Sequence, residues 1–228
     1  MYILLLVFEL IVLWFITRRL TQNLYVALFL LIRSRPIAIA IISFFFFPGT
    51  IIHELSHLFT AEILGVHTSG LTLTPEGLEE SNVRTGSVLI AKTDPIRRAV
   101  IGVAPVFVGL GALFTISYLL PQFAFSYWVL GIGYWVLFAV SNTMFSSPED
   151  MEGFPAVAIT LSLIAIAAYF SGISVGLPAS WIENITSTLS TLTTSIGYIV
   201  GLNLAVFALS FSAITIAEKL SGRKLVGR

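Results

Sequence analysis

The pattern His53-Glu54-Leu55-Ser56-His57 combines metal-binding and proton-transfer side chains within a largely apolar run, residues 37–66. On a helix, residues four apart share a face, so both imidazoles can bind one metal ion while Glu54 reaches a metal-bound water. Because the chain has only three histidines, composition alone would produce this pattern roughly one time in a thousand. The motif therefore predicts a zinc site in which Glu54 is the general base.

A zinc peptidase site needs a third protein ligand and one open position for water. The chain has no cysteine, so the ligand must be a histidine or a carboxylate. An acidic break, residues 146–155, separates two apolar runs and has a proline near each end. Irregular backbone at membrane depth survives where it lines a polar cavity, so a carboxylate there can face the histidines. Asp150 is the favoured ligand because the only other aspartate, Asp94, lies in a surface Thr-Asp-Pro turn.

Several alternatives for the third ligand stay open. Glu149 is the direct rival of Asp150, and the whole acidic break could instead be a solvated loop between helices. The extended soluble motif His-x-x-Gly-x-x-His is excluded, because Thr60 and Ile63 occupy its glycine and last histidine positions. A glutamate about twenty residues after the second histidine is the weaker alternative. It would be Glu76, Glu79 or Glu80, in a turn-rich polar segment.

The composition is that of an integral membrane protein. Hydrophobic residues make up 57% of the 228 residues and charged residues only 11%. Twelve basic and twelve acidic residues balance, and no basic face is present that could neutralise a run of phosphates. The lipid bilayer is therefore an expected partner, and nucleic acid is not.

The apolar runs predict an all-α polytopic membrane protein, a single membrane-embedded domain over residues 1–228. Six runs are candidates for transmembrane helices: residues 2–16, 36–66, 99–120, 123–145, 154–170 and 196–217. The first is interpreted as a retained span, and the short run 20–32 would make a seventh if it crosses. The second run is predicted to break at Pro48-Gly49 and to restart with Thr50 as an N-cap.

Two segments outside these runs have a recognisable pattern. Residues 67–94 are predicted to form a small β-rich insertion at the membrane surface, with short strands at 71–74 and 87–90. Its edge could accept an extended substrate as an additional strand, although a plain hairpin connector fits equally well. Residues 178–195, rich in Ser and Thr with apolar residues at helical spacing, predict an interfacial helix.

The distribution of Lys and Arg predicts the orientation in the membrane. Residues 171–195 contain neither, which suits the outer side. Two basic groups suit the cytoplasmic side: Arg84, Lys92, Arg97 and Arg98 around one connection, and Lys219, Arg223, Lys224 and Arg228 in the tail. The C-terminus is therefore predicted to be cytoplasmic, with Arg33 and Arg35 as exceptions on the outer side.

An apolar His-Glu-x-x-His helix, a surface β segment and a later Asp near a Gly in a broken membrane helix resemble the site-2 protease family. The resemblance covers about residues 36–170 and implies that His53, His57 and Asp150 bind Zn²⁺ while Glu54 is the catalytic base. In that family the Asp is usually followed directly by Gly. Here Gly153 comes three residues later, so Glu149 stays a rival. No PDZ-sized domain is evident, so the resemblance would be that of a minimal or divergent member.

The expected function is that of an intramembrane zinc endopeptidase, which hydrolyses transmembrane or membrane-proximal protein substrates with zinc-activated water. A zinc peptidase that opens at the membrane surface and takes soluble peptides is an alternative. A non-catalytic metal-binding membrane protein or a transporter is another. Glu54, which metal binding does not require, favours catalysis. The sequence does not indicate the substrate or the oligomeric state.

Overall fold

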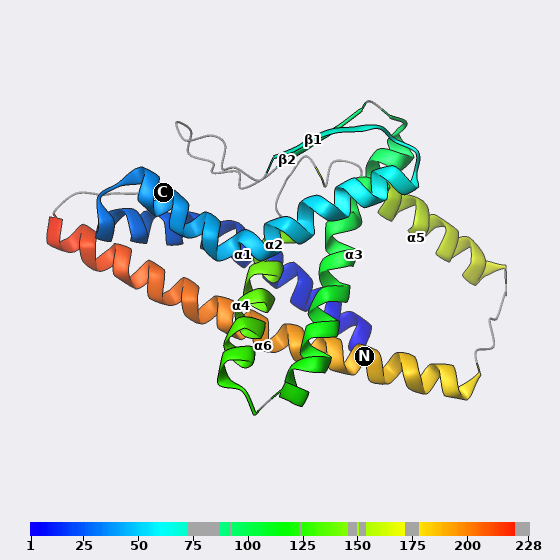
Figure 1. Ribbon diagram of the computed structural model, residues 1–228. Coiled ribbons are helices and arrows are strands. Elements are labelled where there is room, and N and C mark those ends of the chain that lie inside the picture. Colours follow the sequence, from blue (N-terminus) through cyan, green and yellow to red (C-terminus); the bar gives the residue numbers. More distant parts are fainter. Residues whose placement is uncertain are drawn as a thin grey trace.

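A computed structural model describes residues 1–72, 87–91, 93–123, 125–145, 150, 154–171 and 178–221. Its described part is mostly helical, with one small two-stranded sheet (Figure 1). The elements in chain order are α1 (Tyr2–Ile32), α2 (Arg35–Ile63), β1 (Thr68–Thr72), β2 (Ser87–Ile90), α3 (Pro95–Leu119), the short 3-10 helix η1 (Leu120–Phe123), α4 (Tyr127–Thr143), α5 (Phe154–Phe170) and α6 (Ala179–Ser221).

Among the described residues, three helical segments are long and apolar enough to cross a membrane. They are Arg35–Ile63, Pro95–Phe123 and Ala179–Lys219. This finding agrees with the membrane association expected from composition. The full count of six or seven spans, and the side on which the C-terminus lies, stay predictions.

Helix α1 is continuous through Arg18 and Arg19, so the prediction of two separate runs, 2–16 and 20–32, was wrong. No proline or glycine interrupts this stretch, and arginine is a good helix former. The Arg18 guanidinium lies 4.2 Å from the centroid of the Trp14 ring one turn earlier, a cation–π contact that keeps the charge on the helix surface. The helix ends at Arg33, whose left-handed φ of 58° turns the chain into α2.

Helix α2 is also continuous, so the predicted break at Pro48-Gly49 was wrong. Thr50 is not an N-cap, because its hydroxyl donates to the Phe46 carbonyl (3.2 Å) inside the helix. A proline inside a helix removes one backbone donor and is tolerated where neighbouring groups compensate. The carbonyl that lacks its helical donor at Pro48 is that of Phe44, and the Trp135 indole N–H of α4 donates to the adjacent Phe45 carbonyl (2.8 Å).

Helix α6 combines the predicted interfacial helix, 178–195, and the predicted span, 196–217, into one helix of 43 residues. Its hydroxyl groups do not interrupt it, because they donate to carbonyls one turn earlier, as Thr186 does to Ile182 (2.7 Å). At about 1.5 Å per residue, α6 is about 64 Å long, twice the ~30 Å hydrocarbon layer. An upright α6 would therefore extend well beyond one bilayer.

The sheet lies directly after α2 and pairs β1 with β2 in antiparallel fashion, from Thr68 opposite Ile90 to Thr72 opposite Ser87. The second strand matches its predicted bounds, whereas the first begins three residues before the predicted start at residue 71. Residues 73–86, which make up half of the predicted insertion, lie outside the described residues. The Thr68 hydroxyl donates to Glu62 (3.1 Å) and joins the sheet to the end of α2.

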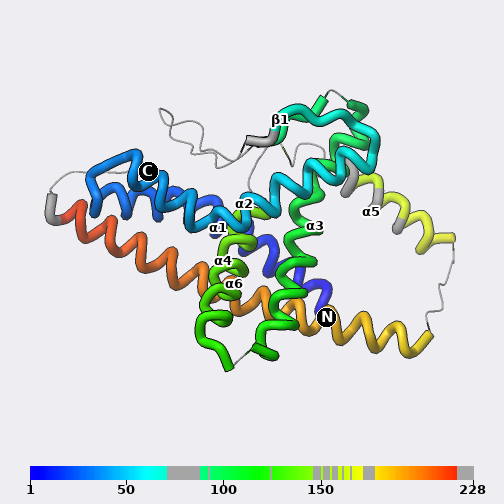
Figure 2. The backbone as a smooth tube through the Cα atoms, in the orientation of Figure 1, coloured from blue at the N-terminus to red at the C-terminus, as the bar shows by residue number. Residues whose placement is uncertain are grey.

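Within the described residues the helices meet in three apolar clusters, of which the smallest joins Ala61 of α2 to Ile101 of α3. Helices α1 and α6 lie side by side, and α3 and α4 cross them (Figure 2). Of the other two clusters, one includes Leu13, Leu113, Val140 and Ile199, and the other joins Leu20 to α2 and α4. The α4–α6 contact also contains a buried hydrogen bond.

That hydrogen bond runs from the Asn142 side-chain amide to the Asn203 side-chain oxygen (2.7 Å). Because Asn142 lies near the end of α4, the bond fixes the point from which the chain continues toward Asp150.

Candidate metal centre

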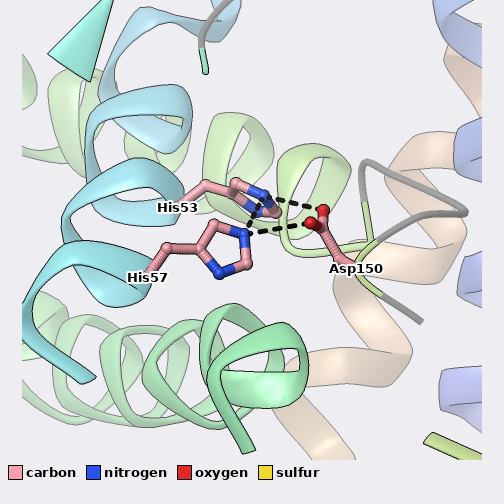
Figure 3. A group of neighbouring side chains, drawn as sticks. All are labelled: His53, His57 and Asp150. Carbon is pink, nitrogen blue, oxygen red and sulfur yellow. Dashed lines mark hydrogen bonds and ion pairs between the residues drawn. The ribbon is translucent and has the colours of Figure 1, made fainter. Parts of the chain in front are cut away.

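His53, His57 and Asp150 come together at one point, with both imidazole rings directed at the carboxylate (Figure 3). The two Nε2 atoms are 3.1 Å apart. Asp150 Oδ2 is 3.4 Å from His53 Nε2, and Asp150 Oδ1 is 3.4 Å from His57 Nε2. Each histidine is only 4% exposed. The local cause is helix geometry, because residues four apart on α2 present their side chains to the same side.

These separations fit a single small metal ion. Zinc binds imidazole nitrogen at about 2.0–2.1 Å, so ligand atoms at the corners of a regular tetrahedron would lie about 3.3–3.4 Å apart. The observed 3.1, 3.4 and 3.4 Å are close to those edges. Two imidazoles and one carboxylate are also a donor set suited to zinc. The group could therefore hold a metal ion, although its geometry does not identify the metal.

Within the described residues the group contains three ligands. Three protein ligands leave the fourth tetrahedral position for water or substrate, whereas structural zinc sites are usually closed by four. The Asp150 side chain is 25% exposed. This arrangement is the one typical of catalytic zinc.

Helix α3 supports Asp150 through Gly102, which has no side chain where the two segments meet. A Cβ at Gly102 would overlap the carbonyl oxygen of Asp150, and its separation from the carbonyl carbon would be 3.1 Å. Burial alone would raise the pKa of Asp150, but its contacts with His53 and His57 outweigh burial and lower that pKa. Asp150 is therefore held as a carboxylate facing the two rings.

Helix α3 also orients His57, because Nδ1 of this ring lies 2.9 Å from the Ile101 carbonyl oxygen. A carbonyl can only accept, so Nδ1 carries the proton and donates. In a neutral imidazole the lone pair is then on Nε2, the atom nearest Asp150 and His53. Metal-binding histidines characteristically have such a partner on the other ring nitrogen.

Glu54 lies beside the group without belonging to it. It is 7% exposed and interacts electrostatically with His53, His57 and Asp150. On α2 it follows one histidine directly and precedes the other by less than a turn. If the three residues bound a metal ion, a carboxylate in this place could exchange a proton with a water molecule on that ion.

Close packing between α2 and α4 fixes where the part of α2 that carries the histidines lies against α4. Gly49, one turn before His53, lies so near α4 that a Cβ would overlap the Ala139 carbonyl and the Thr143 hydroxyl. Sequence reasoning interpreted Gly49 as part of a helix break and missed both Gly102 and the Ile101 carbonyl. Glycines inside otherwise apolar helices were the signal available for the two glycines.

The other acidic candidates are placed as follows. Glu149, Glu76, Glu79 and Glu80 lie outside the described residues. Asp94 caps α3, where its carboxylate accepts the backbone N–H groups of Ile96 (3.1 Å) and Arg97 (3.0 Å). The hydrogen bond from the Arg97 backbone is the main reason that the pKa of Asp94 is lowered.

Comparison of the chain with models of protein families, with curated proteins and with solved structures finds no match.

Proposed function

We propose that this chain is an intramembrane zinc endopeptidase that cuts transmembrane or membrane-proximal protein substrates. One observation supports this activity above all others. His53 and His57 are buried on a helix long and apolar enough to cross a membrane, and they converge with the partly buried Asp150, with Glu54 beside them. Metal binding alone would not require Glu54, whereas hydrolysis requires a base near the attacking water.

In this proposal the three converging residues hold Zn²⁺, and Glu54 moves the proton. A bound Zn²⁺ would polarise the scissile carbonyl and lower the pKa of water from about 15.7 to roughly 7. Glu54 takes one proton from the water whose oxygen attacks the carbonyl carbon. It then delivers that proton to the amine nitrogen as the carbon–nitrogen bond breaks. The Ile101 carbonyl keeps the proton of the His57 ring on Nδ1, so the Nε2 lone pair of this ring would stay available to bind the metal ion throughout.

The membrane arrangement belongs to the same proposal. Because α1 is one continuous helix, we propose six transmembrane helices, with a cytoplasmic C-terminus and with α2 bringing the site below the lipid headgroups. An exposed membrane-surface site for soluble peptides is less favoured, because both histidines are buried and α2 is one of the membrane-capable helices.

The test is cleavage by purified protein in detergent of a panel of single-span reporter proteins with a soluble tag at each end. Wild type should release the tags, and Glu54→Gln should not, while binding one Zn²⁺ per chain as wild type does. Glu62→Gln is the matched control, since Glu62 is an exposed glutamate on the same helix. If Glu54→Gln cleaves as fast as wild type, the proposed mechanism is wrong. If wild type binds no zinc, the metal centre is wrong as well.

A further inference from the structure

Helix α3 contains a proline four residues after the carbonyl that holds His57. In an α-helix the N–H of residue i+4 donates to the carbonyl of residue i, so the Ile101 carbonyl would normally accept from residue 105. That residue is Pro105, which has no N–H. The Ile101 carbonyl instead accepts from His57 Nδ1 at 2.9 Å.

His57, Ile101 and Pro105 are all buried, so the Ile101 carbonyl depends on a donor from the protein. Its donor is the His57 ring rather than a backbone N–H at position 105. Ile101 is 1% exposed and Pro105 is also fully buried. A buried carbonyl without a donor is costly, and water cannot easily reach this one. A proline ring also clashes with the carbonyl four residues earlier, which tilts that carbonyl away from the helix axis. Both effects favour a hydrogen bond to a neighbouring helix.

We propose that Pro105 is a positioning residue, which frees the Ile101 carbonyl of α3 so that this carbonyl holds His57 as its Nδ1-protonated tautomer with Nε2 facing His53 and Asp150. The contact joins α3 to α2, two elements 44 residues apart at this bond. The effect of this contact on zinc binding rests on the proposed metal centre. The proton on His57 Nδ1 does not depend on that proposal, because it can be measured in the protein without metal.

Substitution of Pro105 should separate zinc affinity from stability. Pro105→Ala supplies an N–H that competes for the Ile101 carbonyl and lets this carbonyl return toward the helix axis. Helix propensity improves, because proline is the least favourable residue inside a helix. We therefore expect an unfolding temperature equal to or above that of wild type, together with a zinc dissociation constant about tenfold higher or more. If Pro105 had only a structural role, its substitution would change the unfolding temperature and the zinc affinity in the same direction.

The primary measurement is the tautomer of His57 by ¹⁵N NMR on metal-free protein with labelled histidine. Only three histidines are present, so His53→Gln and His67→Gln variants assign the signals. Wild type should carry the proton on Nδ1, and Pro105→Ala should lose this preference. Pro105→Val supplies the same N–H with a larger side chain, so agreement between the two variants attributes the effect to the N–H. Pro48→Ala, which changes a proline inside α2, should leave the His57 tautomer as in wild type.

The second measurement is zinc affinity by competition with a chelator. If Nδ1 of wild-type His57 carries no proton, the inference is overturned. It is also overturned if both Pro105 variants keep the wild-type tautomer and zinc dissociation constant. If wild type shows the expected tautomer and loses it in the variants but binds no zinc, Pro105 has its proposed role and the proposed metal centre fails.

Discussion

Gly102 of α3 packs so closely against Asp150 that the Asp150 carbonyl oxygen occupies the space of the missing side chain. The contact is between backbone atoms, so no flexible side chain can move aside to relieve an added methyl group. The residue before it, Ile101, supports His57 through its carbonyl. Two consecutive residues of one helix thus hold two of the three candidate ligands.

We expect Gly102→Ala to displace Asp150 from the histidines and to weaken metal binding. An added methyl group in a closely packed contact costs about 1–3 kcal/mol of stability, and here part of that cost should appear as lost zinc affinity. The measurement is the zinc dissociation constant by chelator competition, together with the free energy of unfolding in mixed micelles.

Gly111→Ala is the matched control for this substitution, because Gly111 lies on the same helix and a Cβ there would meet nothing within 4 Å. It should raise helix stability by up to about 1 kcal/mol and leave zinc affinity unchanged. Equal zinc affinity for Gly102→Ala and wild type would show that Gly102 does not position Asp150.

The His53 and His57 pair could be predicted from sequence because its geometry is local. Four residues of helix are sufficient to place the two side chains on one face, whatever the rest of the chain does. Asp150 could be predicted only through the scarcity of aspartates and its place between two apolar runs. The support from Ile101 and Gly102 could not be predicted, because it depends on tertiary packing. The Ile101 carbonyl contacts a residue 44 positions earlier, and Gly102 contacts Asp150, which comes much later in the chain.

The predicted helix boundaries were wrong at three places where the local sequence suggested an end. Helix α1 continues through Arg18 and Arg19, and α2 continues through Pro48. In α6 the hydroxyl groups donate to carbonyls of their own helix, as Thr186 does to Ile182, and the helix continues into the apolar run. Propensity and hydropathy do not include such contacts, whereas the apolar run of α5 has its predicted bounds, 154–170.

The buried Asn142–Asn203 hydrogen bond should contribute measurably to the packing of α4 on α6. We expect Asn142→Ala and Asn203→Ala each to destabilise the protein. The double variant should lose less than the sum of the two, by about 0.5–2 kcal/mol, the range for polar pairs between membrane helices. The measurement is a double-mutant cycle of unfolding free energies in mixed micelles. Asn184→Ala, on an exposed position of α6, should be near neutral, and strict additivity of the two buried changes would contradict this role.

Metal stoichiometry should distinguish Asp150 from its neighbour Glu149 as the third ligand. Asp150 lies 3.4 Å from both histidines through different oxygens, so Asp150→Ala removes the only carboxylate of the described group. We expect bound zinc in Asp150→Ala to fall from one per chain to a small fraction, and in Glu149→Ala to stay at one. The measurement is elemental analysis of protein purified in detergent and freed of loosely bound metal.

Asp150→Asn refines the comparison, because it keeps the size of the side chain and removes its negative charge. Zinc binding in this variant should be weaker than in wild type and stronger than in Asp150→Ala, since an amide oxygen is a poorer ligand for zinc than a carboxylate. If Asp150→Ala keeps one zinc per chain while Glu149→Ala loses it, Glu149 is the ligand. In that case the contact of Asp150 with the two imidazoles is an ion pair beside the site. The packing of Gly102 against the backbone of Asp150 would then position Glu149 as the ligand.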